Sequence, residues 1–346
     1  MSDAGVGLRC AGCATVGLDS RYCVSCGREL GYRYIALPDH DRTPCPDCGG
    51  IRFGADGQCA RCGRPETVPD RLEADLGAVA VLTDRGLVHA RNEDAVAVGV
   101  LDDMVPGVPT AVVIAVSDGV SSSVRPQVAS GTAVRAGVGA GAAALTAGQP
   151  ATDAVMAGLE AAAQAVSAVD VSGDLAPSCT YVSAIVVHNG TDTEITVANI
   201  GDSRAYWLRR ESVDGPGNIP AQRLTVDDSL AQALVDAGVL DEGKAMTDPR
   251  AHTLIRWLGA DSPPKPWADD CVRTMRTTGP GMLLLCSDGL WNYLPTLSAL
   301  SGQVQGAAPA AAATALAEFA LRCGGGDNIT TAVAPVPWRP RKDEVR

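Results

Sequence analysis

The chain has 346 residues, of which 46% are hydrophobic, so it can bury a large core and carry additional small modules. Its formal net charge is −12, so we do not expect it to bind nucleic acid through a basic surface. The N-terminus lacks the apolar core of a signal peptide, and no segment is long and apolar enough to span a bilayer. We therefore expect a cytoplasmic protein without a membrane partner.

The first 62 residues contain eight of the twelve cysteines, arranged as four Cys-x-x-Cys pairs. Each pair can direct two sulfurs from a tight turn to one point, and two pairs supply the four thiolates of a tetrahedral zinc site. We therefore expect two structural Zn²⁺ ions, in zinc ribbons over residues 1–31 and 40–66, with a linker at 67–75. The expected ligands are Cys10, Cys13, Cys23 and Cys26 in the first ribbon, and Cys45, Cys48, Cys59 and Cys62 in the second.

Other interpretations of the cysteine pairs are weaker. A disulfide framework does not suit a chain without a secretion signal, and a redox dithiol motif does not require four copies. Zinc ribbons can bind nucleic acid or proteins. The acidic charge favours a module that docks onto a protein partner.

Residues 76–337 have a different sequence pattern, in which short runs of β-branched residues are interrupted by alanine-rich stretches of helical length. The runs predict strands at 79–82, 95–100, 111–116, 183–188, 194–200, 205–208, 282–286 and 330–336. The other stretches predict helices at 128–145, 153–169, 229–237 and 310–321. This grouping predicts an α+β domain of antiparallel sheets covered by helices, followed by a charged tail at 338–346.

Two of the predicted strands end in the same way. The segments "VVIAVSDG" at 112–119 and "LLLCSDG" at 283–289 each run from apolar residues into Ser-Asp-Gly, which places Asp118 and Asp288 at strand ends. A single Asp-Gly is usually only a turn, but its repetition suggests that the two acids lie at one common site. Glu93, Asp94 and Asp327 also lie next to predicted strands. Several converging carboxylates are the ligands that Mg²⁺ or Mn²⁺ prefers.

An ordered set of seven motifs resembles the metal-dependent serine/threonine protein phosphatases of type 2C. The resemblance extends from about Leu76 to Val336 and implies an antiparallel β-sandwich flanked by helix pairs. The motifs are "TDRGLVHARNEDA", "VSDGVSS", "SCTYVSAIV", "ANIGDSRAYWL", "LTVDDSL", "CSDGLWNYL" and "GGDNIT".

The resemblance implies a centre of two Mn²⁺ or Mg²⁺ ions. Asp118 would bridge both ions, the carbonyl of Gly119 would bind the second, and Asp288 and Asp327 would hold the first. Glu93 and Asp94 would act in the same cluster, directly or through water. Asp202 in "GDSR" matches the position of a third, weaker metal, although it can equally be a turn residue.

The implied reaction is hydrolysis of phosphoserine and phosphothreonine on proteins, by a water shared between the two ions. The substrates would be targets of a serine/threonine kinase. The alternative is a catalytically weak or inactive member that serves as a binding protein in a signalling complex.

Two positions depart from the family pattern. The arginine usually found four residues before the glutamate, where it binds the substrate phosphate, is His89 in this chain. Arg91 lies two residues closer and is the alternative phosphate ligand. The histidine often found in the "TxDH" stretch is Asp228. Because neither change removes an expected metal ligand, we expect an active enzyme with altered substrate handling.

Overall fold

The computed structural model describes residues 7–9, 16–17, 32–38, 45, 47–50, 52, 58–64, 69–102, 109–170, 176–190, 192–209, 219–247 and 250–337. The expected ligands of the first zinc ribbon lie outside these residues, as does the expected charged tail. The second group of cysteines lies within them.

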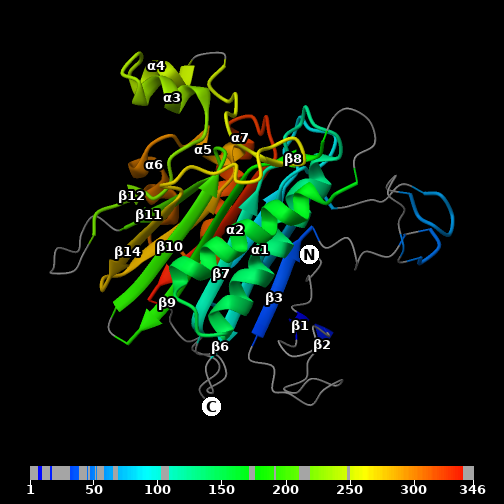
Figure 1. Ribbon diagram of the computed structural model, residues 1–346, viewed down its shortest axis with the longest axis horizontal. Helices are drawn as coiled ribbons and strands as arrows, with labels where there is room; N and C mark the ends of the chain where they lie inside the picture. Colours follow the sequence, from blue (N-terminus) through cyan, green and yellow to red (C-terminus); the bar gives the residue numbers. More distant parts are fainter. Residues whose placement is uncertain are drawn as a thin grey trace.

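Two antiparallel sheets form the centre of the fold (Figure 1). The larger has the order β14-β10-β9-β7-β6-β3-β1-β2. Its strands are β1 (Gly7–Arg9), β2 (Val16–Gly17), β3 (Tyr32–Leu37), β6 (Ala95–Asp102), β7 (Pro109–Ser117), β9 (Tyr181–Asn189), β10 (Asp192–Ile200) and β14 (Val272–Thr277). The smaller has the order β12-β11-β15-β16-β5-β4. Its strands are β4 (Arg71–Asp75), β5 (Ala80–Asp84), β11 (Arg204–Leu208), β12 (Gln222–Arg223), β15 (Gly281–Cys286) and β16 (Ile329–Val336). The short strands β8 (Ser178–Cys179) and β13 (Leu258–Gly259) form a separate pair.

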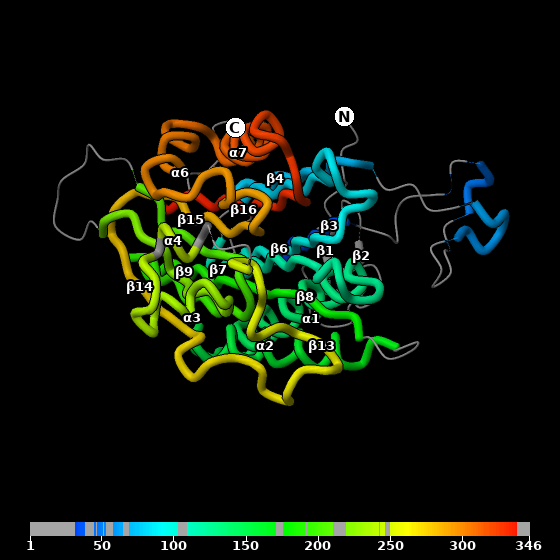
Figure 2. Tube along the Cα trace, turned by 90° about the horizontal axis from the view of Figure 1, so that it is seen from above, coloured from blue at the N-terminus to red at the C-terminus, as the bar shows by residue number. Residues whose placement is uncertain are grey.

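Helices cover both outer faces, so the molecule has four layers (Figure 2). The helices α1 (Pro126–Thr146) and α2 (Ala151–Ser167) pack on the larger sheet, while α6 (Leu297–Val304) and α7 (Pro309–Arg322) lie over the smaller one. The short helix α5 (Asp288–Trp291) follows β15 directly. The helices α3 (Leu230–Asp236) and α4 (Glu242–Thr247) belong to a segment that projects from the sandwich (Figure 1).

Strand β7 shows why the sequence runs of Val and Ile are almost continuous. Val112, Ile114 and Val116 belong to the core between the sheets, whereas Val113 and Ala115 belong to the core beneath α1 and α2. Successive side chains of a strand point to opposite faces, so a strand covered on both sides must be apolar at every position.

The alanine- and glycine-rich composition of α1 and α2 permits close helix packing. A Cβ on Gly158 of α2 would lie 2.9 Å from the carbonyl oxygen of Gly137 on α1, and a Cβ on Gly137 would collide with the Tyr181 hydroxyl at 1.9 Å. Only glycine fits where two backbones approach this closely. These stretches are therefore covering helices, as their spaced Val, Leu and Met residues predicted.

The expected boundary at residue 76 requires correction. Residues 71–75, interpreted from sequence as part of a linker, form β4 and pair with β5. In addition, β3 lies between the two expected ribbons and pairs along β6, with Leu37 opposite Val96. Ile35 and Leu37 are buried in the core between the sheets. The chain N-terminal to residue 76 therefore contributes four strands to the two sheets, β1, β2 and β3 to the larger and β4 to the smaller.

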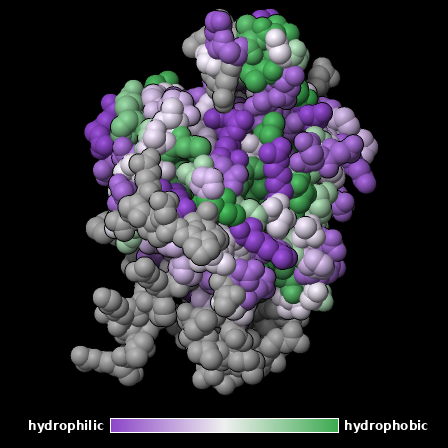
Figure 3. Space-filling view, turned by 90° about the vertical axis from the view of Figure 1, so that its left-hand side faces the viewer, coloured by the Kyte–Doolittle hydropathy of each residue, from purple (hydrophilic) through white to green (hydrophobic). Residues whose placement is uncertain are grey.

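Among the described residues, no helix combines the length and the apolar character needed to cross a membrane. Most large apolar side chains are buried, and Leu87, Val88, Val239 and Ile255 are the large exposed ones in the described part of the chain. In Figure 3, hydrophobic surface gathers on the projecting tip at the top of the molecule, which carries α3 and α4.

Candidate metal centre

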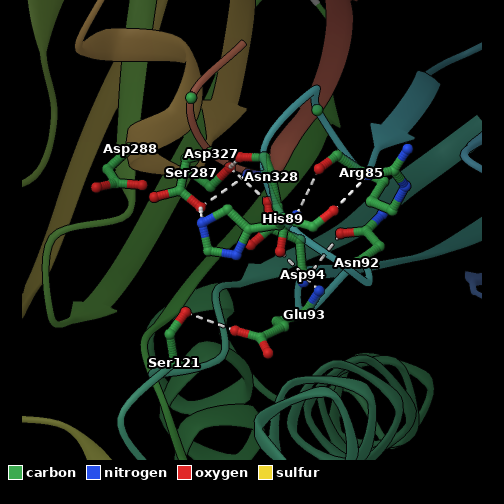
Figure 4. Close-up of polar contacts among 12 residues, drawn as sticks. Arg85, His89, Asn92, Glu93, Asp94, Ser121, Ser287, Asp288, Asp327 and Asn328 are labelled. Atoms are coloured by element: carbon green, nitrogen blue, oxygen red, sulfur yellow. Dashed lines mark hydrogen bonds and ion pairs between the residues drawn. The ribbon is translucent and has the colours of Figure 1, made fainter.

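Acidic residues from four separate segments meet at one end of the sandwich, and Figure 4 labels those from three of them. Asp118 follows β7, and Asp288 follows β15 as the first residue of α5. Glu93 and Asp94 precede β6, and Asp327 precedes β16. The five acids predicted from sequence to share a site are therefore brought together.

Strand register places these acids at the same end. Strands β6 and β7 are antiparallel with Ala95 opposite Ser117, so Asp94 and Asp118 leave the sheet side by side. The Ser287 hydroxyl, which follows β15 of the smaller sheet, donates a hydrogen bond of 2.7 Å to Asp94 Oδ2. This bond joins the ends of the two sheets at the site.

Burial and neighbouring charges raise the pKa values of Asp94 and Asp118. Burial raises the pKa of Asp94 to about 7, with the hydrogen bond from Ser287 lowering it and the charges of Asp327 and Asp288 raising it. Loss of solvent raises the pKa of Asp118 well above its usual range, and the charges of Asp94, Asp288, Asp327 and Asp202 raise it further. Neighbouring anions therefore oppose ionisation, a cost that a bound cation would offset.

Two buried carboxylate oxygens have no hydrogen-bond partner among the described residues, namely Asp94 Oδ1 and Asp288 Oδ1. Buried polar atoms are nearly always paired, and an unpaired one in a native fold calls for an ion or water. The donor set is all oxygen, which is the set that Mg²⁺ and Mn²⁺ prefer. The residues present therefore fit a divalent metal centre.

Asn328 is a structural residue of the site that sequence reasoning did not single out, although it lies in the quoted "GGDNIT" motif. Its Oδ1 accepts a hydrogen bond of 2.7 Å from the Glu93 amide. Its Nδ2 donates to the carbonyl oxygens of Arg85 and Arg91 at 2.7 and 3.1 Å. One side chain therefore fixes the loop that carries His89 and Glu93 against the start of β16.

Gly119 is required by close packing at the end of β7. A Cβ at this position would lie 2.7 Å from the carbonyl oxygens of both Glu93 and Pro126. Its amide donates a hydrogen bond of 3.2 Å to the Glu93 carbonyl, which also accepts one of 2.5 Å from the Ser130 hydroxyl on α1. Helix α1 thus helps to position Glu93.

His89 and Arg91 both face acids of the site. His89 Nε2 lies 3.2 Å from Asp327 Oδ1, and Arg91 Nε lies 2.9 Å from Glu93 Oε1. The Arg91 side chain is 54% exposed and that of His89 is 26% exposed. Both candidate phosphate ligands therefore lie beside the carboxylate cluster, on the same loop.

Asp202 and His252 lie beside Asp288, at one end of the acidic cluster. Asp202, in the turn between β10 and β11, is buried, and its ligand oxygens lie within 4.8 Å of those of Asp288 and of a ring nitrogen of His252. Burial, then the charge of Asp288, raises the pKa of Asp202 well above its usual range. His252 was missed from sequence because it lies in no recognisable motif.

The four cysteines of the second predicted ribbon also converge. Their sulfurs lie within 4.8 Å of one another, with Cys45 to Cys62 and Cys48 to Cys59 both 3.5 Å apart. None forms a disulfide. Zinc bonded to four sulfurs at about 2.3 Å implies a sulfur separation of about 3.8 Å. The cluster therefore has dimensions close to those of a tetrahedral thiolate site.

The turns of this cluster depend on glycine. The amide of Gly49 donates to the Cys45 carbonyl and that of Gly63 to the Cys59 carbonyl, both at 2.8 Å. Both glycines have positive φ angles, 67° and 74°. Glycine adopts this left-handed conformation without steric cost, so its place after each pair follows from the turn.

No protein-family model matches the chain. Searches for similar sequences and similar structures both find serine/threonine phosphatases. The chain is 33% identical over 264 residues to the serine/threonine protein phosphatase PstP of Mycobacterium tuberculosis, a match covering 74% of this chain and 44% of that protein. It is 36% identical over 116 residues to the serine/threonine phosphatase Stp of Listeria monocytogenes, covering 34% of this chain and 40% of that protein. The chain thus spans less than half the length of these relatives.

Solved structures resemble most of the described fold. The PPM Ser-Thr phosphatase MsPP of Mycobacterium smegmatis, crystallised with cacodylate, superposes with a TM-score of 0.57 at 26% identity, covering 75% of this chain and 99% of that one. The catalytic domain of PstP in complex with two manganese ions gives a TM-score of 0.53 at 26% identity, covering 75% and 97%. Fold, acid positions and sequence similarity together show that this chain is similar to the PPM serine/threonine phosphatases over 74–75% of its length.

Proposed function

We propose that this chain hydrolyses phosphoserine and phosphothreonine on proteins by means of two Mn²⁺ or Mg²⁺ ions. The observation that carries the proposal is the convergence of Asp94, Asp118, Asp288 and Asp327 at one end of the sandwich, with two buried carboxylate oxygens left without partners. The two manganese ions in the related PstP structure support the same assignment.

Asp118, Asp288 and Asp327, together with the carbonyl of Gly119, are the proposed ligands. Bound divalent ions supply a nucleophilic water at neutral pH and offset charge on the phosphoryl oxygens. The chain's own task is to hold these oxygens in place. Ser287 fixes Asp94 through its 2.7 Å hydrogen bond.

Glu93 lies in the same cluster, held from two sides. Its Oε2 accepts a hydrogen bond of 2.5 Å from the Ser121 hydroxyl, while Arg91 contacts Oε1. Such fixed second contacts orient a carboxylate toward a metal or its water. The inactive, purely binding alternative is less favoured, because every expected acid is present at the site.

The proposed substrates are phosphoproteins modified by a serine/threonine kinase. We assign the phosphate contact to His89, because it occupies the position of the family arginine and lies beside Asp327. Each of the two candidates already contacts an acid of the site, His89 with Asp327 and Arg91 with Glu93, so the family position decides the assignment.

We further propose that the four-cysteine cluster binds one structural Zn²⁺, supported by its sulfur separations of 3.5 Å. The sequence pattern of Cys10, Cys13, Cys23 and Cys26 supports a second ion. Closed thiolate sites leave no open coordination position for catalysis. The module's proposed role is therefore to dock a protein partner.

The substitution Asp288→Asn should lower phosphopeptide hydrolysis at limiting Mn²⁺ by about tenfold or more, equivalent to about 1.4 kcal/mol of transition-state stabilisation. The amide keeps the shape of the side chain but removes a negative charge from the proposed metal ligand. Steady-state kinetics over a Mn²⁺ titration measure the effect. Glu160→Gln, at an exposed position on α2, is the matched control and should leave the titration unchanged. Equal Mn²⁺ dependence in Asp288→Asn and the wild-type chain would contradict the assignment.

His89→Ala should raise KM for phosphopeptides roughly tenfold, or about 1.4 kcal/mol, with a smaller effect on kcat. His89→Arg should lower KM, because guanidinium binds phosphate through two parallel hydrogen bonds. Kinetics on one phosphopeptide compare both variants with Arg91→Ala. A severalfold rise in KM for Arg91→Ala, with KM unchanged in His89→Ala, would assign the phosphate contact to Arg91 instead.

Metal analysis of the purified full chain should find two zinc ions. Cys59→Ser should reduce this number to one, because a hydroxyl is a poor substitute for a thiolate ligand. Cys323→Ser, at an exposed cysteine beyond α7, is the matched control and should retain both ions. An unchanged zinc content in Cys59→Ser would show that the cluster does not hold the metal.

A further inference from the structure

His252 brings an imidazole to the edge of the acidic cluster from the segment between α4 and β13. Its Nδ1 lies 3.6 Å from Asp288 Oδ2 and 4.0 Å from Asp202 Oδ2. The donor atoms of these three residues all lie within 4.8 Å of one another. The three residues are far apart in the sequence, and the fold alone brings them together.

These separations are compatible with a shared ion. Around an octahedral ion with bonds of about 2.1 Å, adjacent donor atoms are about 3.0 Å apart and opposite ones about 4.2 Å apart. The observed separations of 3.6 and 4.0 Å fall within this interval. A small rotation of an exposed imidazole would bring three donors to one centre.

The imidazole is held in place by Trp291. The rings of His252 and Trp291 stack with centroids 5.6 Å apart and an interplanar angle of 28°. The Trp291 indole nitrogen donates a hydrogen bond of 3.0 Å to the backbone carbonyl of Asp202. The guanidinium of Arg204 lies 3.5 Å from the centroid of the Trp291 ring. Trp291 therefore ties the imidazole and Asp202 to one rigid side chain.

The segment that carries His252 is also fastened to the Asp202 turn. Asp228 Oδ2 accepts a hydrogen bond of 3.2 Å from the Gly201 amide, and Asp228 Oδ1 accepts one of 2.6 Å from Arg256. The amide of Ile255 donates to the Asp228 carbonyl at 2.8 Å. Asp228, which departs from the family pattern, thus holds the His252 segment beside the cluster.

Among the described residues, His252 is the cationic or neutral nitrogen group that forms a close contact with both acids. Asp202 is 5% exposed and Asp288 is 9% exposed, and Asp288 Oδ1 has no hydrogen-bond partner among the described residues. The nearby Arg204 is committed to Asp227, with Nε 3.0 Å from both of its carboxylate oxygens. Two nearly buried carboxyl groups and one imidazole therefore offer a set of two oxygen donors and one nitrogen donor.

We propose that His252 is a nitrogen ligand to a divalent cation held together with Asp202 and Asp288. This inference rests on the proposed metal-dependent function. It specifies the donor atoms of a third metal ion beside the proposed pair. An imidazole donor suits the later transition metals and binds Mn²⁺ less strongly, whereas Mg²⁺ is bound through oxygen. The third position thus differs chemically from the all-oxygen pair, and it couples metal binding to the projecting segment.

Pulsed electron paramagnetic resonance on the full chain tests this donor set directly. The cysteine sites are first filled with diamagnetic Zn²⁺, and Mn²⁺ is then added in excess. Nitrogen-14 modulation from a coordinated imidazole should appear in the wild-type chain and persist in His89→Ala. It should be lost in His252→Ala, which should also bind one fewer Mn²⁺ in equilibrium dialysis.

The outcomes separate this inference from the proposed function. Mn²⁺ binding without nitrogen-14 modulation in the wild-type chain, or modulation retained in His252→Ala, would overturn the role of His252 while leaving the two-metal centre intact. Loss of modulation in His89→Ala alone would assign the nitrogen to the other imidazole. Failure of the wild-type chain to bind Mn²⁺ at all would overturn both proposals.

Discussion

The site depends on one electrostatic constraint, the crowding of carboxylates at the end of a β-sandwich. Loss of solvent raises the cost of ionising Asp94, Asp118, Asp202 and Asp327, and the charges of neighbouring acids, including Asp288, raise it further. These carboxyl groups must either bind protons or be offset by a cation, because unpaired charges in a poorly solvated environment are expensive. The proposed metal ions would thus make this end of the fold favourable at a pH where the carboxyl groups are ionised.

The sandwich makes this crowding possible because it is rigid on both faces. Strand β7 is packed between the opposing sheet and the helices α1 and α2, which leaves Asp118 little freedom to move away from its neighbours. Asn328 and Gly119 then lock the Glu93 loop against two strands. Rigid elements hold functional groups more precisely than free loops do.

The N-terminal segment belongs to this support. Leu37 of β3 lies opposite Val96, two residues beyond Asp94, and Arg135 of α1 donates to the Pro38 carbonyl. Arg135 also donates to the Gly131 carbonyl, next to Ser130, which holds Glu93. The strand between the two cysteine groups therefore adjoins the proposed metal centre. A truncated chain that starts at residue 72 would lose the buried side chains of β3.

Much of this arrangement was predictable from the sequence. The apolar strands ending in Asp118 and Asp288, the helices rich in alanine, and the cysteine spacing at 45–62 each carry a local signal with a physical cause. By contrast, β3 and β4 lie in polar or mixed sequence. They are strands because β3 pairs with β6 and β4 with β5, and such pairing is not visible in the local sequence. His252 acts through contacts across the fold and lies in no motif. Asn328 lies in the "GGDNIT" motif, but its hydrogen bonds to the carbonyls of Arg85 and Arg91 depend on the fold.

Thermal unfolding of the full chain with and without Mn²⁺, at about pH 5 and about pH 8, tests the central claim most directly. Carboxyl groups with raised pKa values, such as Asp94 at about 7, bind more protons in the folded than in the unfolded state. The metal-free protein should therefore lose stability as pH rises from about 4 through about 7. Excess Mn²⁺ should raise Tm, and should do so more at the higher pH, where the ligands are ionised. A metal-free Tm that does not fall with pH, together with no Mn²⁺ stabilisation at either pH, would contradict the account.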